Sequence, residues 1–270
     1  MKFFAVAGTI WLSHISYAQS ATSLIGARAA GMGYASATLS DESSLFNNIG
    51  AIAGLKKTCS YFVNEVRPAL PGANRAAAAF LLTTRSGAAG LGFYRFGDEL
   101  YSEQILSAGI GNRFGLASLG AKLSLIQYRA EATGTKQAAT ISFGGLAQLT
   151  PNLFVGAYII NLTQSRIASE RLPAKLVAGL GFRPDEHVYW VTEVEKDVDY
   201  NASWKTGVEY GIQNKVFFRT GFNLNPLTGY GGLGICTRHV KIDYAISLSN
   251  TLGAAHQASA SYQFEKKKIK

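Results

Sequence analysis

The chain of 270 residues is poor in the groups from which disulfide frameworks, metal centres and active sites are built. It contains two cysteines, Cys59 and Cys236, which are too few for a disulfide scaffold or a zinc site. We expect both thiols to be free and buried, because the strands to which we assign them are not neighbours. No G-x-S-x-G, H-E-x-x-H or phosphate-loop motif is present. The sequence therefore predicts no catalytic residue, no metal, no cofactor and no enzyme activity.

Long hydrophobic runs and charged residues are also scarce. After residue 18 no segment offers 18 consecutive apolar residues, which excludes a helical membrane protein. Charged residues make up 16%, below the quarter that is typical of soluble domains, while glycine reaches 29 residues. The formal net charge is +9, but no basic helix, RNA-binding signature or zinc spacing accompanies it, so nucleic acid is not an expected partner. Hydrophobicity spread over short alternating stretches favours a transmembrane β-barrel.

The first 18 residues have the pattern of a cleaved export signal. Lys2 provides a positive start, residues 3–12 form a short apolar stretch, and Ser16 and Ala18 place small residues at a cleavage site. The apolar stretch is about half of the roughly 20 residues that a helix needs to span a bilayer. A buried first strand or helix is the alternative. We expect residues 1–18 to be removed on export, without a lipoprotein anchor, because no cysteine follows.

Fourteen segments alternate apolar and polar residues between turn residues, and most have about the 9–11 residues that a tilted strand needs to cross a bilayer. They are residues 57–66, 75–84, 87–96, 102–113, 115–128, 136–148, 152–163, 173–183, 186–196, 202–211, 214–224, 229–237, 239–248 and 256–264. An even number is typical of bacterial single-chain barrels. The expected fold is an all-β, transmembrane antiparallel β-barrel over residues 57–264, followed by a basic periplasmic tail over residues 265–270.

The lengths of the connections support this fold. Joins after even-numbered segments are short, as at residues 85–86 and 113–114, whereas joins after odd-numbered segments are mostly longer and more polar, as at residues 65–74 and 164–172. Outer-membrane barrels have short periplasmic turns and longer external loops, so the asymmetry fits strands that start and end in the periplasm. A soluble β-sandwich stays the alternative, because alternation alone also fits a half-buried sheet.

If the apolar faces of the strands point to lipid, charged side chains gather inside the barrel. The predicted lumen charge network consists of Lys122, Glu193, Glu195, Lys205, Glu209, Arg219, Lys241 and Asp243. Such charges are tolerated in a lumen where they are paired or wet. They could form a polar path or a latch for a plug. A purely structural ion-pair network is the alternative, and we favour it.

Residues 26–55 stand apart from the strands, since they are rich in Gly, Ala, Ser and Asn and carry little charge. We predict that residues 19–56 form a hatch inside the barrel. The runs G-A-R-A-A-G-M-G-Y-A at 26–35, D-E-S-S at 41–44 and N-N-I-G at 47–50 resemble the leader of the PorV/PorQ family, relatives of the FadL-type fatty acid transporters. The hatch motif comprises Gly26, Arg28, Gly31, Met32, Gly33, Asn47, Asn48 and Gly50. Asn48 stands where the family has proline.

The resemblance extends to short runs in the last third of the chain, at residues 172–173, 193–196, 207–210, 219–221, 241–245 and 252–256. It implies a fourteen-stranded barrel with an N-terminal hatch in the outer membrane of a Bacteroidetes-type Gram-negative cell. The first hypothesis is an accessory subunit of type IX secretion, with a large translocon barrel or secreted proteins as partners. The alternative is a FadL-like transporter for small hydrophobic molecules. Outer-membrane lipid and lipopolysaccharide are expected partners in both cases.

Overall fold

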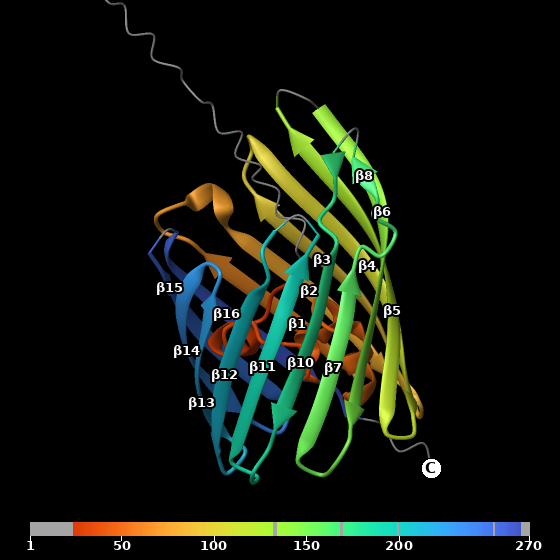
Figure 1. Ribbon diagram of the computed structural model, residues 1–270, viewed down its shortest axis with the longest axis vertical. Coiled ribbons are helices and arrows are strands. Elements are labelled where there is room, and N and C mark those ends of the chain that lie inside the picture. Colours follow the sequence, from red (N-terminus) through yellow and green to blue (C-terminus); the bar gives the residue numbers. More distant parts are fainter. Residues whose placement is uncertain (1–23, 132–133, 168–169, 199, 251, 266–270) are drawn as a thin grey trace, which may run out of the picture.

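Fourteen strands form one closed antiparallel barrel in the computed structural model, which describes residues 24–131, 134–167, 170–198, 200–250 and 252–265 (Figure 1). The barrel strands are β1 (Cys59–Val66), β2 (Arg75–Thr83), β3 (Gly87–Gly97), β4 (Tyr101–Phe114), β5 (Ala117–Ala130), β6 (Gly134–Gln148), β7 (Leu153–Ile160), β10 (Lys175–Phe182), β11 (Val188–Asp197), β12 (Ser203–Ile212), β13 (Val216–Leu224), β14 (Leu227–Cys236), β15 (Val240–Ser249) and β16 (Gly253–Gln263). The prediction of fourteen strands is confirmed. The β-sandwich alternative is wrong, because β1 pairs with β16 and closes the sheet.

The connections keep the predicted asymmetry. Tight turns join β2 to β3 and β4 to β5 at one end of the barrel, whereas the other end carries the longer loops (Figure 1). Two features of these loops escape the sequence analysis, a short helix η3 (Pro71–Ala73) and a hairpin of β8 (Arg166–Ile167) and β9 (Glu170–Arg171). The described residues contain no helix that is long and apolar enough to cross a membrane. The predicted signal peptide and residues 266–270 lie outside the described residues.

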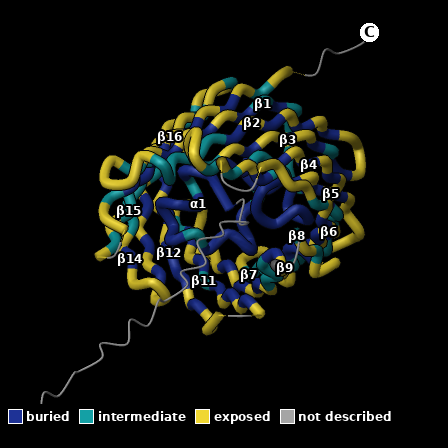
Figure 2. The backbone as a smooth tube through the Cα atoms, turned by 90° about the horizontal axis from the view of Figure 1, so that it is seen from above, coloured by how far each residue is buried: buried dark blue, intermediate teal, exposed yellow. Residues whose placement is uncertain are grey.

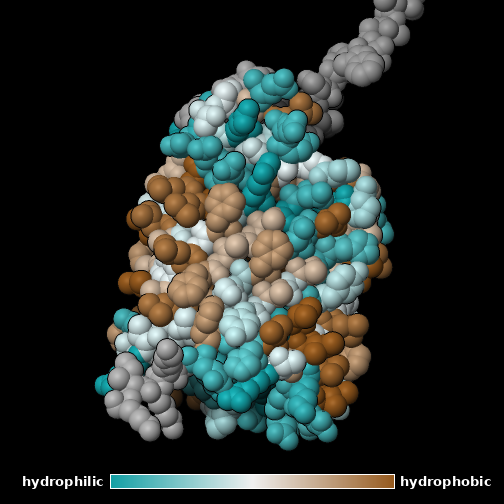
Figure 3. Space-filling view, turned by 180° about the vertical axis from the view of Figure 1, so that it is seen from behind, coloured by the Kyte–Doolittle hydropathy of each residue, from teal (hydrophilic) through white to brown (hydrophobic). Residues whose placement is uncertain are grey.

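The outside of the barrel is apolar, as a lipid-facing wall requires. Large hydrophobic side chains point outward on strand after strand, and Leu91, Ile110 and Leu123 are 62%, 61% and 48% exposed. Figure 3 shows hydrophobic side chains gathered across the middle of one face, with hydrophilic side chains above them. Exposure of this extent is unfavourable in water, and it identifies the barrel as a transmembrane one.

The inside of the barrel departs from the simple rule of apolar outside and polar inside. The predicted charges other than Lys122 lie on the inward faces of β11, β12, β13 and β15. The inward faces of β1–β5 are largely apolar, for example at Val63, Leu81 and Ile105, with Glu65, Glu103 and Lys122 as charged exceptions. Strand β2 looks irregular in sequence for this reason, since Ala77, Ala79 and Leu81 point inward while Phe80 and Leu82 point outward. The apolar half of the lumen is possible because protein, not water, covers it.

The covering protein is the hatch, the segment 24–56 that precedes β1. It contains α1 (Ala27–Gly31) and two 3₁₀ helices, η1 (Glu42–Leu45) and η2 (Ile49–Gly54). Figure 2, a view down the barrel, shows α1 and most of the hatch buried within the ring of strands. Asp41 caps η1 by accepting a hydrogen bond from the Ser43 amide, so this acidic residue marks the start of the helix.

Candidate functional site

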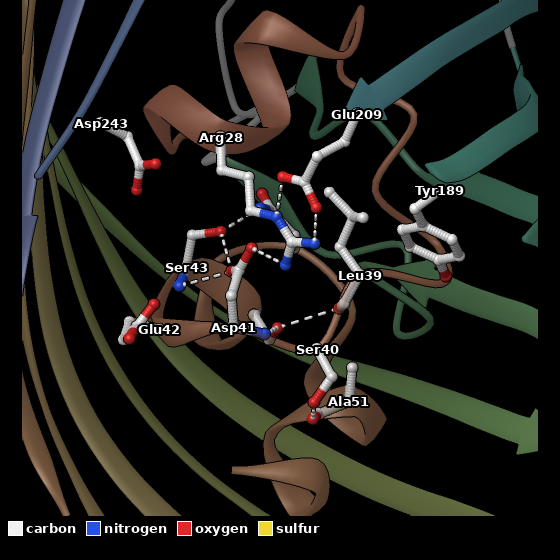
Figure 4. A network of polar contacts seen from close by, with 12 residues as sticks. Arg28, Leu39, Ser40, Asp41, Glu42, Ser43, Ala51, Tyr189, Glu209 and Asp243 are labelled. Carbon is white, nitrogen blue, oxygen red and sulfur yellow. Dashed lines mark hydrogen bonds and ion pairs between the residues drawn. The ribbon is translucent and has the colours of Figure 1, made fainter. Parts of the chain in front are cut away.

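A chain of alternating charges joins the hatch to the barrel wall. Arg28 of α1 donates from Nε and Nη2 to the two carboxylate oxygens of Glu209 on β12, at 2.8 and 2.6 Å (Figure 4). Glu209 also accepts from Nε of Arg219 on β13 at 2.6 Å, and Arg219 pairs with Asp243 on β15 at 2.8 Å. All are buried or nearly so. Because Arg28 pairs with Asp41 as well, at 3.3 Å, the hatch is tied to itself and to the wall at one point.

The same chain returns to the hatch at Glu42. Lys241 on β15 lies 3.5 Å from both Asp243 and Glu42. Burial alone would raise the pKa of the Glu42 carboxyl, but the Lys241 ammonium and hydrogen bonds from Gln263 and Ser261 outweigh burial and lower this pKa to about 2. Glu42 is therefore ionised at neutral pH, and the ion-pair chain starts and ends on neighbouring hatch residues.

A second contact uses the hatch backbone. Glu193 on β11 accepts hydrogen bonds from the backbone amides of Ser36 and Ala37, at 2.7 and 2.8 Å. Lys205 on β12 lies 3.2 Å from Glu193 and 2.6 Å from Glu195, and balances their charge. A carboxylate that accepts two amide protons holds a loop in one position.

Sequence reasoning missed a third contact, around Glu65 near the loop end of β1. Glu65 is paired with Arg75 and Arg67 and accepts a hydrogen bond from the hydroxyl of the hatch residue Tyr34 at 2.9 Å. Gln257 on β16 donates to Glu65 at 2.8 Å. The inward alternation of β1 places Glu65 in the lumen, and this signal could have been used.

The opposite side of the hatch is apolar. Leu45, Phe46, Ile49 and Ile52 are fully buried and pack against the inward faces of β1–β5 in one hydrophobic cluster. The other wall residues of this cluster include Val63, Leu81, Tyr94, Ile105 and Ile126. The hatch therefore has a charged face toward β11–β16 and a largely apolar face toward β1–β5, where Tyr34 makes its contact with Glu65.

Inward-facing glycines let the hatch approach the wall closely. A Cβ added to Gly207 on β12 would lie 2.5 Å from the carbonyl oxygen of Met32, and one added to Gly50 would lie 2.5 Å from that of Gly144 on β6. Gly31, Gly33 and Gly26 of the hatch motif are also in tight places, against the wall or, for Gly26, against Ser43. Wall glycines that meet the hatch are Gly90, Gly92, Gly109, Gly111, Gly120, Gly144, Gly156, Gly179, Gly181, Gly207, Gly221 and Gly232. At the height of these glycines the hatch fills the lumen.

The two asparagines of the motif hold the hatch together and dock it. The Asn47 amide group bonds both the amide and the carbonyl of Ile25. Asn48 accepts from the Gly50 amide at 3.1 Å and so caps η2, and it donates to the carbonyls of Ala37 and of Gly145 on β6, at 2.6 and 2.9 Å. An amide side chain thus shapes the turn where the resembling family has proline.

Lys122 does not join the predicted charge network. It lies on β5, among the apolar strands and across the lumen from Glu209, and it is 3% exposed. Cys59 on β1 is free and buried, and Cys236 on β14 is free but only half-buried. The strands of the two cysteines are separated by β15 and β16, which explains why no disulfide joins them.

The wall has a seam between β6 and β7 at which the strands pair over a short length. Only Phe143–Gln148 of β6 pair with Ile159–Phe154 of β7, which is the shortest ladder among the described barrel strands. Nearer the loop end, isolated hydrogen bonds join β6 to the chain that follows β7. The Leu162 amide donates to the Ile141 carbonyl at 2.8 Å, and the Ser165 hydroxyl donates to the Ala139 carbonyl at 2.6 Å. The hatch touches this seam through the Asn48 bond to Gly145.

On the turn side, a cavity of 460 Å³ with a mixed lining of charged and apolar residues reaches the ion-pair chain. Its lining includes Arg28, Asp41, Arg183 and Glu209. The described residues contain no cluster of ligands that could hold a metal ion.

Comparison with known proteins supports the fold of the chain but assigns the chain to no family. No protein-family model and no curated protein matches the chain. The structure is similar to the CymD monoaromatic hydrocarbon channel, with a TM-score of 0.69, 12% identity, and coverage of 91% of this chain and 99% of that one. It is also similar to the toluene transporter TbuX of Ralstonia pickettii, with a TM-score of 0.61, 12% identity and coverage of 91% and 100%. A Pseudomonas aeruginosa FadL homologue is similar as well, with a TM-score of 0.64, 12% identity, and coverage of 89% of this chain and 98% of that one.

At 12% identity these similarities establish the architecture of the barrel and not its substrate. All three neighbours combine a barrel of matching extent with the names of channels, transporters or FadL relatives. They lend no support to the PorV/PorQ resemblance or to a role in type IX secretion. Those two statements stay predictions from the sequence motifs.

Proposed function

We propose that this chain is an outer-membrane barrel that takes up small hydrophobic compounds and releases them sideways through its wall. The observation that supports the proposal is a layer of apolar side chains, interrupted by the buried Glu103, on the lumen wall at the loop side of a closed hatch. Ile105, Ile126 and Tyr128 lie toward the loop ends of β4 and β5, beyond the glycines that contact the hatch, and Leu172 lies next to the β6–β7 seam. All four side chains are buried, so a hydrophobic molecule that enters from outside reaches this apolar layer only when the segments that cover it move aside.

A straight path through the barrel is blocked because the hatch meets the wall backbone to backbone. The β6–β7 seam offers a shorter route, since its ladder has the fewest paired residues among the described barrel strands and the exit leads into lipid. The names of the hydrocarbon-channel neighbours favour the same function, although their sequences are too distant to fix a substrate.

Uptake of radiolabelled toluene by cells that lack their own hydrocarbon channel tests this function. In a background with Cys59→Ala and Cys236→Ala, we would place a disulfide across the seam with Phe143→Cys and Ile159→Cys, which are paired in register. The expected result is uptake above empty-vector cells that falls several-fold on oxidation and recovers on reduction. The matched control joins β5 to β6 with Leu123→Cys and Ile141→Cys, also paired, and leaves uptake unchanged. No uptake above the empty vector would refute the function, and an ineffective lock would refute the sideways route.

A second function is favoured by the tight fit of the hatch. Ion pairs, backbone hydrogen bonds and close glycine contacts suit a permanent seal, as expected of an accessory subunit in a secretion complex. Gentle detergent extraction from the native membrane, followed by mass spectrometry, separates the two. A stoichiometric large barrel in the extract supports the subunit, and a lone barrel with a bound hydrophobic molecule supports the transporter.

A further inference from the structure

The outer wall of β3–β6 carries a groove that neither the hatch nor the lumen explains. Two hollows of 690 and 460 Å³ lie on this lipid-facing side. The first is almost entirely apolar, with the small side chains of Ala89, Ala108 and Ala121 between larger ones. The larger side chains are Phe80, Leu82, Leu91, Ile110, Leu123 and Ile141. The second combines Phe93, Leu106 and Leu125 with three glutamines, Gln104, Gln127 and Gln137.

Strand register shows that the two hollows are one groove. Three successive rows of outward residues across β3, β4, β5 and β6 join the first hollow to the second, and successive rows are two residues, or about 7 Å, apart. The rows are Leu91, Ala108, Leu123 and Ile141; then Phe93, Leu106, Leu125 and Ala139; then Arg95, Gln104, Gln127 and Gln137. The groove is therefore apolar toward the middle of the barrel and polar toward the loop end, which is the arrangement of an amphiphile.

Two arginines flank the polar end. Arg95 shares the row of the glutamines, and Arg129 stands one row beyond Gln127 on β5; both are exposed. No ion pair or hydrogen bond joins either guanidinium group to another residue of the described chain. Elsewhere on the wall, the outward Lys196 of β11 is satisfied by the carbonyl of Tyr200. Guanidinium groups bind phosphate through two parallel hydrogen bonds, so a pair of unpartnered arginines favours a phosphorylated ligand.

We propose that this groove binds one phosphorylated outer-leaflet lipid of the lipid A type. Acyl chains lie over Ala108 and Ala121, the phosphate lies between Arg95 and Arg129, and the glutamine row hydrogen-bonds the saccharide head group. The position on the lipid-facing wall selects a membrane lipid over a soluble anion, because the apolar part of the groove opens only toward the bilayer. The proposal rests on the outer-membrane location proposed above, and not on transport.

The test is native mass spectrometry of delipidated protein with three lipid probes: diphosphorylated lipid A, the same lipid without phosphates, and phosphatidylethanolamine. We expect one lipid A per barrel, bound at least tenfold more tightly than the other two, as charge-assisted hydrogen bonds imply. The variant Arg95→Gln with Arg129→Gln should lose roughly tenfold of this affinity and the preference for phosphate. Ala108→Trp, which fills the groove, should weaken all three lipids.

Matched controls lie on other strands. Lys196→Gln removes an outward cation away from the groove, and Ala258→Trp enlarges an outward alanine on β16; neither should change lipid A binding. The proposal would be overturned if the control variants lost as much lipid A affinity as the groove variants. It would also be overturned if the protein bound inorganic phosphate alone, or if it formed a dimer that Ala108→Trp disrupts. If Ala108→Trp fails to fold, the arginine variants still decide. Toluene uptake by the double arginine variant should stay unchanged, so a failure of transport and a failure of the lipid site give different results.

Discussion

The two halves of the lumen wall hold the hatch by different physical means. Toward β11–β16 the hatch meets buried carboxylates, arginines and a lysine through ion pairs and amide hydrogen bonds. Toward β1–β5 it meets mainly aliphatic and aromatic side chains, whose contacts impose little orientation, and the hydrogen bond from Tyr34 to Glu65 is the polar contact described above. Ion pairs fix the register and orientation of a segment, whereas apolar contacts supply stability that depends little on orientation. The comparison suggests that the charged half positions the hatch and the apolar half keeps it in place.

The largest effect is expected from Glu209→Ala on the charged half. It leaves Arg28 and Arg219 buried without their shared partner, and breaking one partner of a buried ion pair costs about 3–5 kcal/mol. Hydrogen exchange of the amides of residues 24–56 should show the hatch opening. Glu265→Ala is the control, because its pair with Arg238 is exposed and should be worth about 1 kcal/mol or less. Equal protection in the two variants would refute a positioning role for the charged half.

A slightly smaller effect is expected from Leu45→Ala on the apolar half. Leu45 is fully buried, and such truncations cost about 2–5 kcal/mol through lost burial and a residual cavity. The same exchange experiment should show faster opening of the hatch, but the Arg28–Glu209 contact should persist and keep η1 in its orientation. If Leu45→Ala displaces the hatch while Glu209→Ala does not, the roles of the two halves are reversed.

The smallest effect on the hatch is expected from lowering the pH. The pKa of Glu42 is about 2 in the folded protein, below its ordinary value of 4.5, so its contribution is fully present above about 4.5 and is lost as the pH falls toward 2. Limited proteolysis between pH 5 and pH 2.5 should show the η1 region loosening before the apolar half. The part of this pH dependence that Glu42 causes should be missing in Glu42→Gln, and a variant with the wild-type profile would contradict the assignment.

Much of the barrel could be predicted from sequence because strand alternation is a local property. The fourteen segments, their apolar outward faces and the short and long connections follow from neighbouring residues alone. The hairpin β8–β9 was missed because two-residue strands carry no periodic pattern. The prediction that the lumen is polar holds for only about half of the wall. Strand β2, for example, is apolar on both faces, and its sequence does not say which face the hatch covers.

The charge network shows the same limit. Alternation correctly points Lys122 and Glu209 inward, but it does not say where on the circumference each strand stands, so Lys122 was grouped with carboxylates that lie across the lumen. Glu65 was omitted although it contacts the hatch through Tyr34. Asn48 looked like a departure from a motif, and only its three bonds show that it caps η2 and docks the hatch.

The sequence by itself determined an alternating, glycine-rich chain that closes into a barrel with a small-residue segment to fill it, since these are properties of local pattern and side-chain size. Tertiary structure alone decided which wall is charged and which is apolar, where the β6–β7 ladder is short, and how Arg95, Arg129 and three glutamines meet above an apolar groove. Those arrangements depend on strand register and closure, which bring together residues far apart in the chain.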